Sequence, residues 1–188
     1  MLRPALTLLA AFTLLCGFVY PVVVTGVAQL AFPAAANGSP VEAGGRVVGS
    51  ALVGQAWKDP RYLWGRPSAI APVPYDGRSS TGSNLGPLNP ALAAAVEARL
   101  ETLRAADPGN RAPVPVDLVT TSGSGLDPHV SPAAALYQVP RIARARSLPE
   151  ERVRAVIRAH VEPPVLGLLG APRVNVLAVN LALDGLAP

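Results

Sequence analysis

The chain is poor in the residues that most often carry chemistry. Its 188 residues include one cysteine, two histidines and only 5% aromatic residues. A single cysteine cannot form an intramolecular disulfide, so a folded domain must be held together by packing alone. His129, His160 and Asp127 are the only plausible metal-ligand cluster, which is a poor match to a zinc site. No Gly-Lys-Ser or Gly-Lys-Thr triplet is present, which excludes a Walker-type phosphate loop.

Basic residues are present but do not cluster. The net charge is +4, fifteen of the sixteen basic residues are arginines, and most are spread from Arg46 to Arg173. Binding of nucleic acid needs a basic stripe with aromatic residues or a known module, and neither occurs. We therefore expect no nucleic-acid partner.

Charge is entirely absent from Ala5 to Phe32, where Leu, Val, Ala and Phe dominate. A helix needs about 20 apolar residues to cross a bilayer. A cleaved signal peptide is the alternative, but its apolar region has typically about 7–15 residues. The run is too long for that, so residues 1–33 are predicted to form a cytoplasmic tip and a transmembrane helix in the lipid bilayer.

The charges that flank this helix predict its orientation. Arg3 lies beside one end, whereas the nearest basic residue after the other end is Arg46. Positive charge near a membrane helix favours the cytoplasmic side. We therefore expect a single-pass protein of the inner (plasma) membrane, with a cytoplasmic N-terminus and an extracytoplasmic C-terminal domain.

Small and polar residues recur every four positions within the helix. They are Thr13, Gly17, Pro21 and Thr25. Such a row allows a second helix to approach closely, which predicts a site of membrane-helix packing against a partner. The alternative is that Gly and Pro are simply common in membrane helices.

Residues 34–45 are predicted to be a linker, and residues 46–188 one compact extracytoplasmic domain. About 150 residues suffice for a single domain with its own core. Asn89 and Pro90 begin a predicted helix that ends at Asp107, and its face with Glu97, Arg99, Glu101 and Arg104 is predicted to be solvated. Ser131 and Pro132 begin a second, which continues to about Arg146 with an interruption at Pro140.

Other segments complete an α+β fold in which a small sheet packs with helices. Ser147 and Glu150 have capping-box spacing, which predicts a helix through His160. Strands are predicted at residues 46–53, 114–121 and 173–183, the last with a central position in the sheet. Residues 57–75 contain prolines and aromatic residues and predict an irregular, packed loop.

Two polar loops are candidates for a surface role. The first, residues 76–90, contains Ser83, Asn84 and Asn89, and its leucines favour an ordered loop over a flexible linker. The second, residues 122–132, contains Ser122, Ser124, Asp127 and His129. Ser124 has glycines immediately adjacent rather than two residues away, so it does not match a hydrolase nucleophile elbow. A turn in which Asp127 accepts backbone amides is the structural alternative.

Five collinear segments together resemble the C subunit of the bacterial potassium-transporting (Kdp) P-type ATPase. They are GSALVGQAW (49–57), YLWGRPSA (62–69), GSNLGPLNP (82–90), PVDLVTTSGSGLDPHVSPAAALYQV (115–139) and GAPRVNVLAVNLALD (170–184). They cover most of the predicted external domain. Pro140 and the Thr120-Thr121 pair depart from the pattern.

The resemblance implies a non-catalytic accessory subunit of a high-affinity potassium uptake system. In that family a channel-like A subunit selects potassium and a B subunit hydrolyses ATP. The C subunit assembles and stabilises this complex and is described as a catalytic chaperone that raises the ATP affinity of the pump subunit. ATP and potassium are thus implied for the complex, with no cofactor bound covalently to this chain.

The resemblance also suggests candidate residues. A glutamine is said to coordinate nucleotide in the family, which points weakly to Gln55 or Gln138. An external domain cannot reach a cytoplasmic nucleotide, so an effect on ATP requires coupling through the membrane. The polar loops could instead shape the ion entrance, with Asp127 attracting cations. The alternative of another class is a membrane-anchored periplasmic hydrolase or solute-binding domain acting alone.

Overall fold

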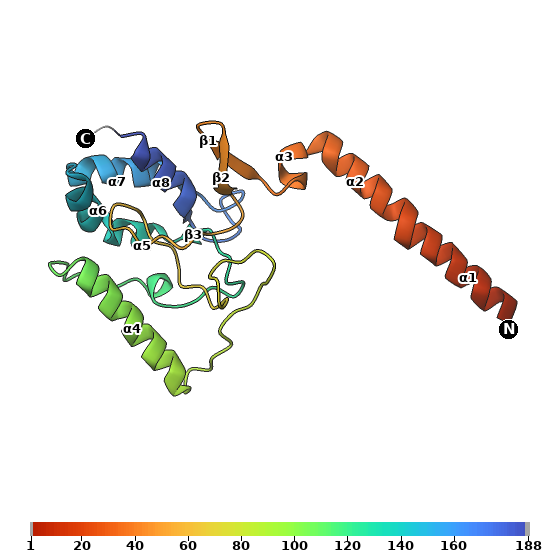
Figure 1. The fold of residues 1–188 in the computed structure, drawn as a ribbon, viewed down its shortest axis with the longest axis horizontal. Helices are drawn as coiled ribbons and strands as arrows, with labels where there is room; N and C mark the ends of the chain where they lie inside the picture. The colour runs from red at the N-terminus through yellow and green to blue at the C-terminus, as the bar shows by residue number, and fades with distance from the viewer. Residues whose placement is uncertain (1, 187–188) are drawn as a thin grey trace. The chain divides into compact units, whose positions relative to one another are not determined.

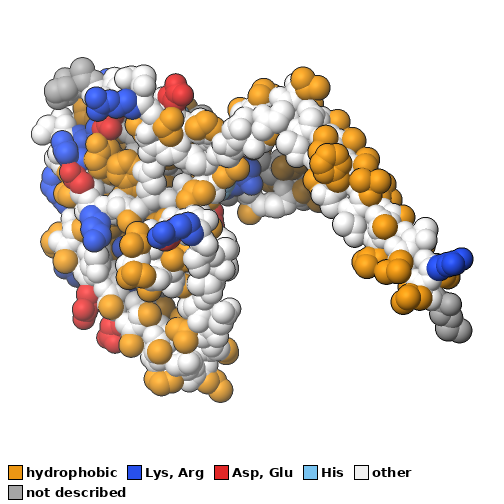
Figure 2. Space-filling view, turned by 45° about the vertical axis from the view of Figure 1, so that its right-hand side comes forward, with side chains coloured by type: hydrophobic (Ala, Val, Ile, Leu, Met, Phe, Trp, Pro, Cys, Tyr) orange, Lys and Arg blue, Asp and Glu red, His pale blue; other side chains and the backbone are white. Residues whose placement is uncertain are grey.

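The computed structural model describes residues 2–186, and the chain divides into two compact units, Met1–Val41 and Glu42–Pro188 (Figure 1). The first unit is a long apolar helix from Leu2 to Ala31, built from α1 (Leu2–Leu14), the π-helical segment η1 (Leu15–Val19) and α2 (Tyr20–Ala31). Thirty residues rise about 45 Å, more than the roughly 30 Å of a bilayer core. The predicted helix is confirmed, and apolar side chains cover it (Figure 2).

A widened turn interrupts this helix just before Pro21. The Tyr20 amide donates to the Leu15 carbonyl, five residues back. Proline has no amide hydrogen and crowds the preceding turn, which accounts for a π segment at this place. In an α-helix, residues four apart drift by about 40° per step. The wider turn offsets part of that drift for the row from Thr13 to Thr25.

A pair of amide side chains closes the C-terminal end of the helix. Asn37 Nδ2 donates to Gln29 Oε1 (3.1 Å), and Gln29 Nε2 donates to Asn37 Oδ1 (3.4 Å). Asn37 Nδ2 also donates to the Pro33 carbonyl (2.7 Å). The short helix α3 (Pro33–Ala36) lies between the two amides, so part of the predicted linker is helical.

A β-hairpin follows, formed by β1 (Pro40–Ala43) and β2 (Arg46–Ser50). Gly44 and Gly45 both have positive φ (58° and 75°), as a two-residue hairpin turn requires. The strand predicted at residues 46–53 is therefore present but ends at Ser50, followed by one bridge between Ser50 and Val53.

A three-stranded antiparallel sheet lies in the second unit. Its order is β3 (His129–Val130), β5 (Arg173–Asn175), β4 (Val161–Glu162), and Val174 pairs with both Val130 and Val161. The helices α5 (Pro132–Tyr137), α6 (Val139–Arg146), α7 (Glu150–Ala159) and α8 (Val176–Asp184) pack together beside it (Figure 1). The α+β prediction is confirmed, as is the central position of the strand that begins at Arg173.

The core of this unit is aliphatic, with one tryptophan. Completely buried side chains are Leu63, Leu118, Ile142, Ile157 and Leu183, with several valines and alanines around them. Burial of each large side chain stabilises the fold by about 1.5–3 kcal/mol. Packing alone therefore holds a domain that has no cysteine.

Two buried amides fix the irregular segment at residues 57–75. Asn180 Oδ1 accepts from the Leu63 amide (2.7 Å), and Asn180 Nδ2 donates to the Leu63 carbonyl (3.0 Å). Gln138 makes the same pair of bonds to Trp64 (2.9 and 3.1 Å). Each side-chain amide bonds to both the N–H and the C=O of one residue, as a neighbouring strand would. This segment is therefore ordered without belonging to a sheet.

Helix α4 (Pro90–Ala106) begins and ends where the sequence predicts. The Asn89 side chain accepts from the Ala91 amide (2.9 Å), and Asp107 is the C-cap residue. The prediction of a fully solvated face is wrong for Arg99. Its guanidinium donates to the carbonyls of Leu118 (3.0 Å) and Gly65 (3.2 Å), and burial lowers its pKa.

The strand predicted at residues 114–121 is wrong. This segment contains only the 3-10 helix η2 (Val116–Leu118), with the Leu118 amide bonded to the Pro115 carbonyl. Pro113 and Pro115 cannot donate to a sheet, so a tight turn that buries Leu118 is the better solution.

The strand predicted at residues 173–183 is wrong after Asn175. The Asn175 side chain accepts from the Ala178 amide (3.1 Å) and begins α8. Its buried residues are Val176, Leu177, Val179, Asn180 and Leu183. Positions i, i+3, i+4 and i+7 form one face of a helix, so the segment satisfies helical periodicity as well as alternation.

The predicted capping box is also wrong. Ser147 is the left-handed C-cap residue of α6 (φ 54°), and Pro149 precedes α7 without a side-chain cap. The helix itself does extend to His160 as predicted, since His160 is its C-cap residue. Ser131 does begin α5, where its hydroxyl accepts from the Ala134 amide (3.0 Å).

Candidate functional site

The two predicted polar loops lie against each other. The Thr81 amide donates to the Ser124 carbonyl (3.0 Å), and a Cβ on Gly82 would lie 3.1 Å from the Gly123 carbonyl oxygen. Ser68 Oγ donates to the Gly125 carbonyl (2.7 Å) from a third segment. The structure thus joins residues 66–82 and 122–127, far apart in sequence, into one surface.

Polar side chains of the second loop mainly stabilise its own turns. Ser122 Oγ accepts from the Gly125 amide (2.9 Å), and Ser124 Oγ accepts from the Leu126 amide (3.1 Å). Asp127 Oδ1 accepts from the His129 amide (2.9 Å), as the turn interpretation predicts. In the first loop, Ser83 and Asn84 are exposed, and Asn84 has a left-handed backbone (φ 52°).

Asp127 lies in a row of charged and titratable side chains. Arg66 Nη1 is 3.3 Å from Asp127 Oδ2, and His129 Nδ1 is 3.5 Å from Asp127 Oδ1. On the other side of the imidazole, Glu162 lies 4.0 Å away and is itself bonded to Arg173 (2.8 Å). Asp127 already has a cationic partner, so its negative field on a passing cation is reduced.

Tyr75 lies close to the second loop, at residues 122–132. Its hydroxyl donates to the Arg66 carbonyl, and a Cβ on Gly54 would meet both the Tyr75 ring and the Asp127 carbonyl oxygen. Burial raises the pKa of Tyr75 to about 12. The loop that carries Asp127 therefore lies close to a buried side chain that is neutral near pH 7.

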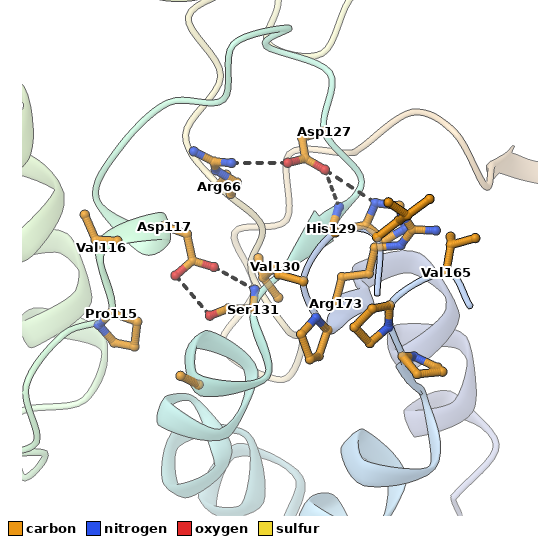
Figure 3. Close-up of a pocket in the computed structure, with 17 residues that line it drawn as sticks. Arg66, Pro115, Val116, Asp117, Asp127, His129, Val130, Ser131, Val165 and Arg173 are labelled. Atoms are coloured by element: carbon orange, nitrogen blue, oxygen red, sulfur yellow. Dashed lines mark hydrogen bonds and ion pairs between the residues drawn. The ribbon is translucent and has the colours of Figure 1, made fainter. Parts of the chain in front are cut away.

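A pocket of about 620 Å³ opens beside this loop (Figure 3). Asp117 lies on one side, where its carboxylate accepts from the Ser131 amide (2.7 Å) and the Ser131 hydroxyl (3.2 Å). The opposite side is formed by residues 163–165 and 169–173. Proline, valine, leucine and alanine predominate in the lining, with Asp117, Asp127, His129, Arg66 and Arg173 as its charged or titratable members.

The hairpin at residues 163–172 exposes large apolar side chains. Leu166 is 86% exposed, Leu168 85% and Leu169 64%. Its backbone is closed by bonds in both directions between Val165 and Leu169. The sequence signal is four large apolar residues without charge between prolines and glycines.

The two candidate glutamines are both bonded within the fold. Gln55 Nε2 donates to the Val48 carbonyl (2.8 Å). Gln138 is buried, and besides its bonds to Trp64 it donates to the Ala134 carbonyl (3.2 Å) and accepts from Arg141 (2.6 Å). A link of either residue to nucleotide stays a prediction.

Sequence reasoning missed Arg141 altogether. Its side chain stacks 4.1 Å from the centre of the Trp64 ring and donates to the Pro60 carbonyl (2.6 Å). Burial lowers its pKa. A helix rich in arginine resembles a solvated surface, and Trp64 is too distant in sequence to reveal the contact.

The arrangement offers little for catalysis. Within residues 2–186 no group of three or more His, Cys, Asp or Glu residues could hold a metal ion. Ser131 bonds to Asp117 and His129 lies beside Asp127, so these two side chains do not form a nucleophile–base pair. An apolar helix long enough to span a bilayer precedes a domain that carries an exposed apolar hairpin.

Comparison with known proteins gives the family. The model of the family "K+-transporting ATPase, c chain" (KdpC) matches residues 2–185. A potassium-transporting ATPase KdpC subunit of Sorangium cellulosum is 65% identical over 184 residues, which cover 98% of this chain and 97% of the relative. That of Variovorax paradoxus is 61% identical over 186 residues, 99% of this chain and 96% of the relative. The chain belongs to the KdpC family.

Proposed function

We propose that this chain is the non-catalytic accessory subunit that joins an ATP-hydrolysing subunit to a potassium-translocating subunit. Helix Leu2–Ala31 anchors it in the plasma membrane with the N-terminus in the cytoplasm. Arg3 supports this orientation, because positive charge favours the cytoplasmic side. The names of its relatives support membership of a potassium-transporting ATPase.

One observation carries this proposal. The polar groups suited to chemistry, namely Ser122, Ser124, Asp127 and Gln138, are each bonded within the fold, whereas the leucines of the 163–172 hairpin face solvent. Large exposed apolar side chains that gather in one place mark interaction surfaces. Such a domain is suited to contact a protein, and no reactive pair favours the alternative of an independent hydrolase.

An effect on ATP would then be indirect. An extracytoplasmic domain is separated from a cytoplasmic nucleotide by the bilayer. It raises the ATP affinity of the pump subunit by binding one conformational state of that subunit more tightly, which by linkage favours nucleotide bound to that state. ATP and potassium are thus ligands of the complex, and this chain is a catalytic chaperone.

The polar loops at residues 82–89 and 122–127 are proposed to border the ion entrance. Their contact supports the idea, since they form one surface with exposed residues such as Ser83 and Asn84. Replacement of Asp127 by alanine should raise the potassium concentration for half-maximal activity while the complex stays assembled. Loss of the complex would favour the turn-forming role of Asp127 instead.

The decisive experiment is affinity purification of this chain from mild detergent after expression with its genomic neighbours. Potassium-stimulated ATP hydrolysis is then measured on whatever co-elutes. Co-elution of a pump and a channel-like subunit, with hydrolysis lost when this chain is omitted, is the expected result. A chain that elutes alone, beside a pump that works without it, would overturn the proposal.

A further inference from the structure

We infer that the pocket between Asp117 and the 163–172 hairpin is a docking groove for a partner subunit. Its occupant is an extracytoplasmic segment that presents a lysine or arginine flanked by apolar residues. This inference rests on the proposed function, since it assigns one surface of the accessory subunit to a protein contact.

The first argument is the charge of Asp117. Eight of the twelve acidic side chains pair with an arginine in the described residues 2–186. Of the other four, Glu42, Glu97 and Glu101 are exposed to solvent. Asp117 alone in this range is both partly buried and without a cationic partner.

Ser131 satisfies only part of the Asp117 carboxylate. An ionised carboxylate has about four acceptor positions, and Ser131 occupies two of them through its amide and hydroxyl. Removal of charge from water is unfavourable unless a partner compensates for it. The carboxylate lines the pocket, so a cation placed there would compensate its charge.

The other cations of the pocket cannot take this role. Arg66 is bonded to Asp127 and to the Thr121 carbonyl (3.0 Å), and Arg173 is bonded to Glu162. His129 lies between these two pairs. Each of the two arginines at the pocket thus has a carboxylate partner, whereas Asp117 remains as the complement to an incoming charge.

The second argument is the apolar wall opposite Asp117. Val165 and Leu169 line the pocket and are 57% and 64% exposed, and the hairpin has no charge from Pro163 to Pro172. Lysine and arginine lay their aliphatic stems along apolar surface while the charged head finds a carboxylate. An apolar wall facing a single carboxylate matches that shape.

A bare potassium ion fits the same groove less well. Ion sites surround potassium with several oxygens, such as rings of carbonyls. The lining here consists mainly of proline, valine, leucine and alanine side chains. The geometry therefore favours a protein side chain.

The test is photo-crosslinking within the whole complex. A benzophenone amino acid replaces Leu168, which is exposed next to the groove, and the co-expressed complex is irradiated after purification. A crosslink to a partner subunit is expected. D117N should reduce its yield at least fivefold, whereas E101Q, which removes an exposed and unpaired carboxylate on α4, should leave it unchanged.

A second measurement avoids any dependence on the folding of D117N. In the complex that keeps Asp117 and carries the benzophenone at position 168, the crosslink yield should fall several-fold as the salt concentration is raised, because screening weakens an ion pair. A yield that does not respond to salt or to D117N would overturn the charge pairing. Crosslinking to lipid alone would overturn the inference that the occupant is a protein. An unchanged crosslink in D117N, together with a higher potassium concentration for half-maximal activity, would overturn it as well.

These outcomes are separate from failure of the proposed function. If the complex co-purifies and hydrolyses ATP but no crosslink forms at position 168, only the docking groove is wrong. If the chain does not co-purify with any subunit, the proposed function itself fails.

Discussion

Residues 122–132 and residues 163–172 are both glycine-containing loops of the second unit, but their side chains point in opposite directions. Residues 122–132 turn their polar side chains toward their own backbone and pack beneath residues 66–82. Residues 163–172 close their backbone locally and direct leucines to solvent. We therefore expect residues 122–132 to contribute to the stability of the domain, and residues 163–172 to contribute little to it and to be free to contact a partner.

Substitution of one glycine in each loop should give the largest difference in stability between the two loops. Gly125 and Gly167 both have positive φ (68° and 72°), but a Cβ on Gly125 would lie 2.7 Å from the Thr81 carbonyl oxygen, and one on Gly167 would meet nothing within 4 Å. We expect Gly125→Ala to lower the free energy of unfolding by about 3 kcal/mol and Gly167→Ala by about 1 kcal/mol.

Denaturant titration followed by tryptophan fluorescence measures both variants, because Trp57 and Trp64 are the only tryptophans and lie in the domain. Equal losses would show that the two loops are packed alike and would remove the basis of the comparison.

Stability at alkaline pH tests the contribution of Tyr75, which lies close to residues 122–132. The pKa of Tyr75 is about 12 in the folded state and about 10 in an unfolded chain. The unfolded chain therefore releases this proton first, so the contribution of Tyr75 is complete below pH 10 and is lost as pH rises to 12. A shift of two units corresponds to about 2–3 kcal/mol.

Tyr75→Phe should reduce that alkaline loss, although it lacks the bond to the Arg66 carbonyl at neutral pH. Comparison of the two pH profiles removes the titration of groups that both proteins share, such as Arg141, whose pKa is lowered by burial, and Tyr62, whose pKa is raised by burial. Parallel profiles from pH 9 to 12 would contradict the assignment to Tyr75.

Asp127→Ala tests the ion pair between Asp127 and Arg66, which joins residues 122–132 to the segment at residues 66–82. The change removes the bond to the His129 amide and leaves Arg66, partly buried, without its carboxylate. We expect a loss of about 1–2 kcal/mol in the free energy of unfolding. Asp127→Asn keeps an acceptor for the amide and should lose less; an equal loss in both variants would assign the effect to the ion pair alone.

Leu166→Ser and Leu168→Ser should have the smallest effect on stability. Both side chains are about 85% exposed, and surface changes usually alter stability by less than about 0.5 kcal/mol. The same variants should weaken retention of the chain in the purified complex. A large drop in thermal stability of the free chain would mean that the hairpin leucines pack within the domain.

Local signals allowed much of the fold to be predicted. Asn89 and Ser131 begin helices because a short polar side chain followed by proline satisfies free amides whatever the tertiary context. The membrane helix follows from length and apolarity. Asn175 also caps a helix, α8. No proline follows it, so the alternation of Val and Leu predicts a strand there instead.

The contacts that define the candidate site could not be predicted in this way. Asp117 finds Ser131 fourteen residues away, and Gln138 finds Trp64 at a separation of 74. Such pairs depend on how helices and turns pack, which single-sequence periodicity does not encode. Exposure of the hairpin leucines is likewise a property of the folded surface.

The amide pair between Gln29 and Asn37 has a mechanical consequence. Both of its hydrogen bonds span the short helix α3, so the end of the membrane helix and the first residues beyond it resist being pulled apart. Tension on the chain beyond Asn37 would load these two bonds before it reached the backbone bonds of the helix. We therefore expect the pair to hold the last turn of the helix against unwinding.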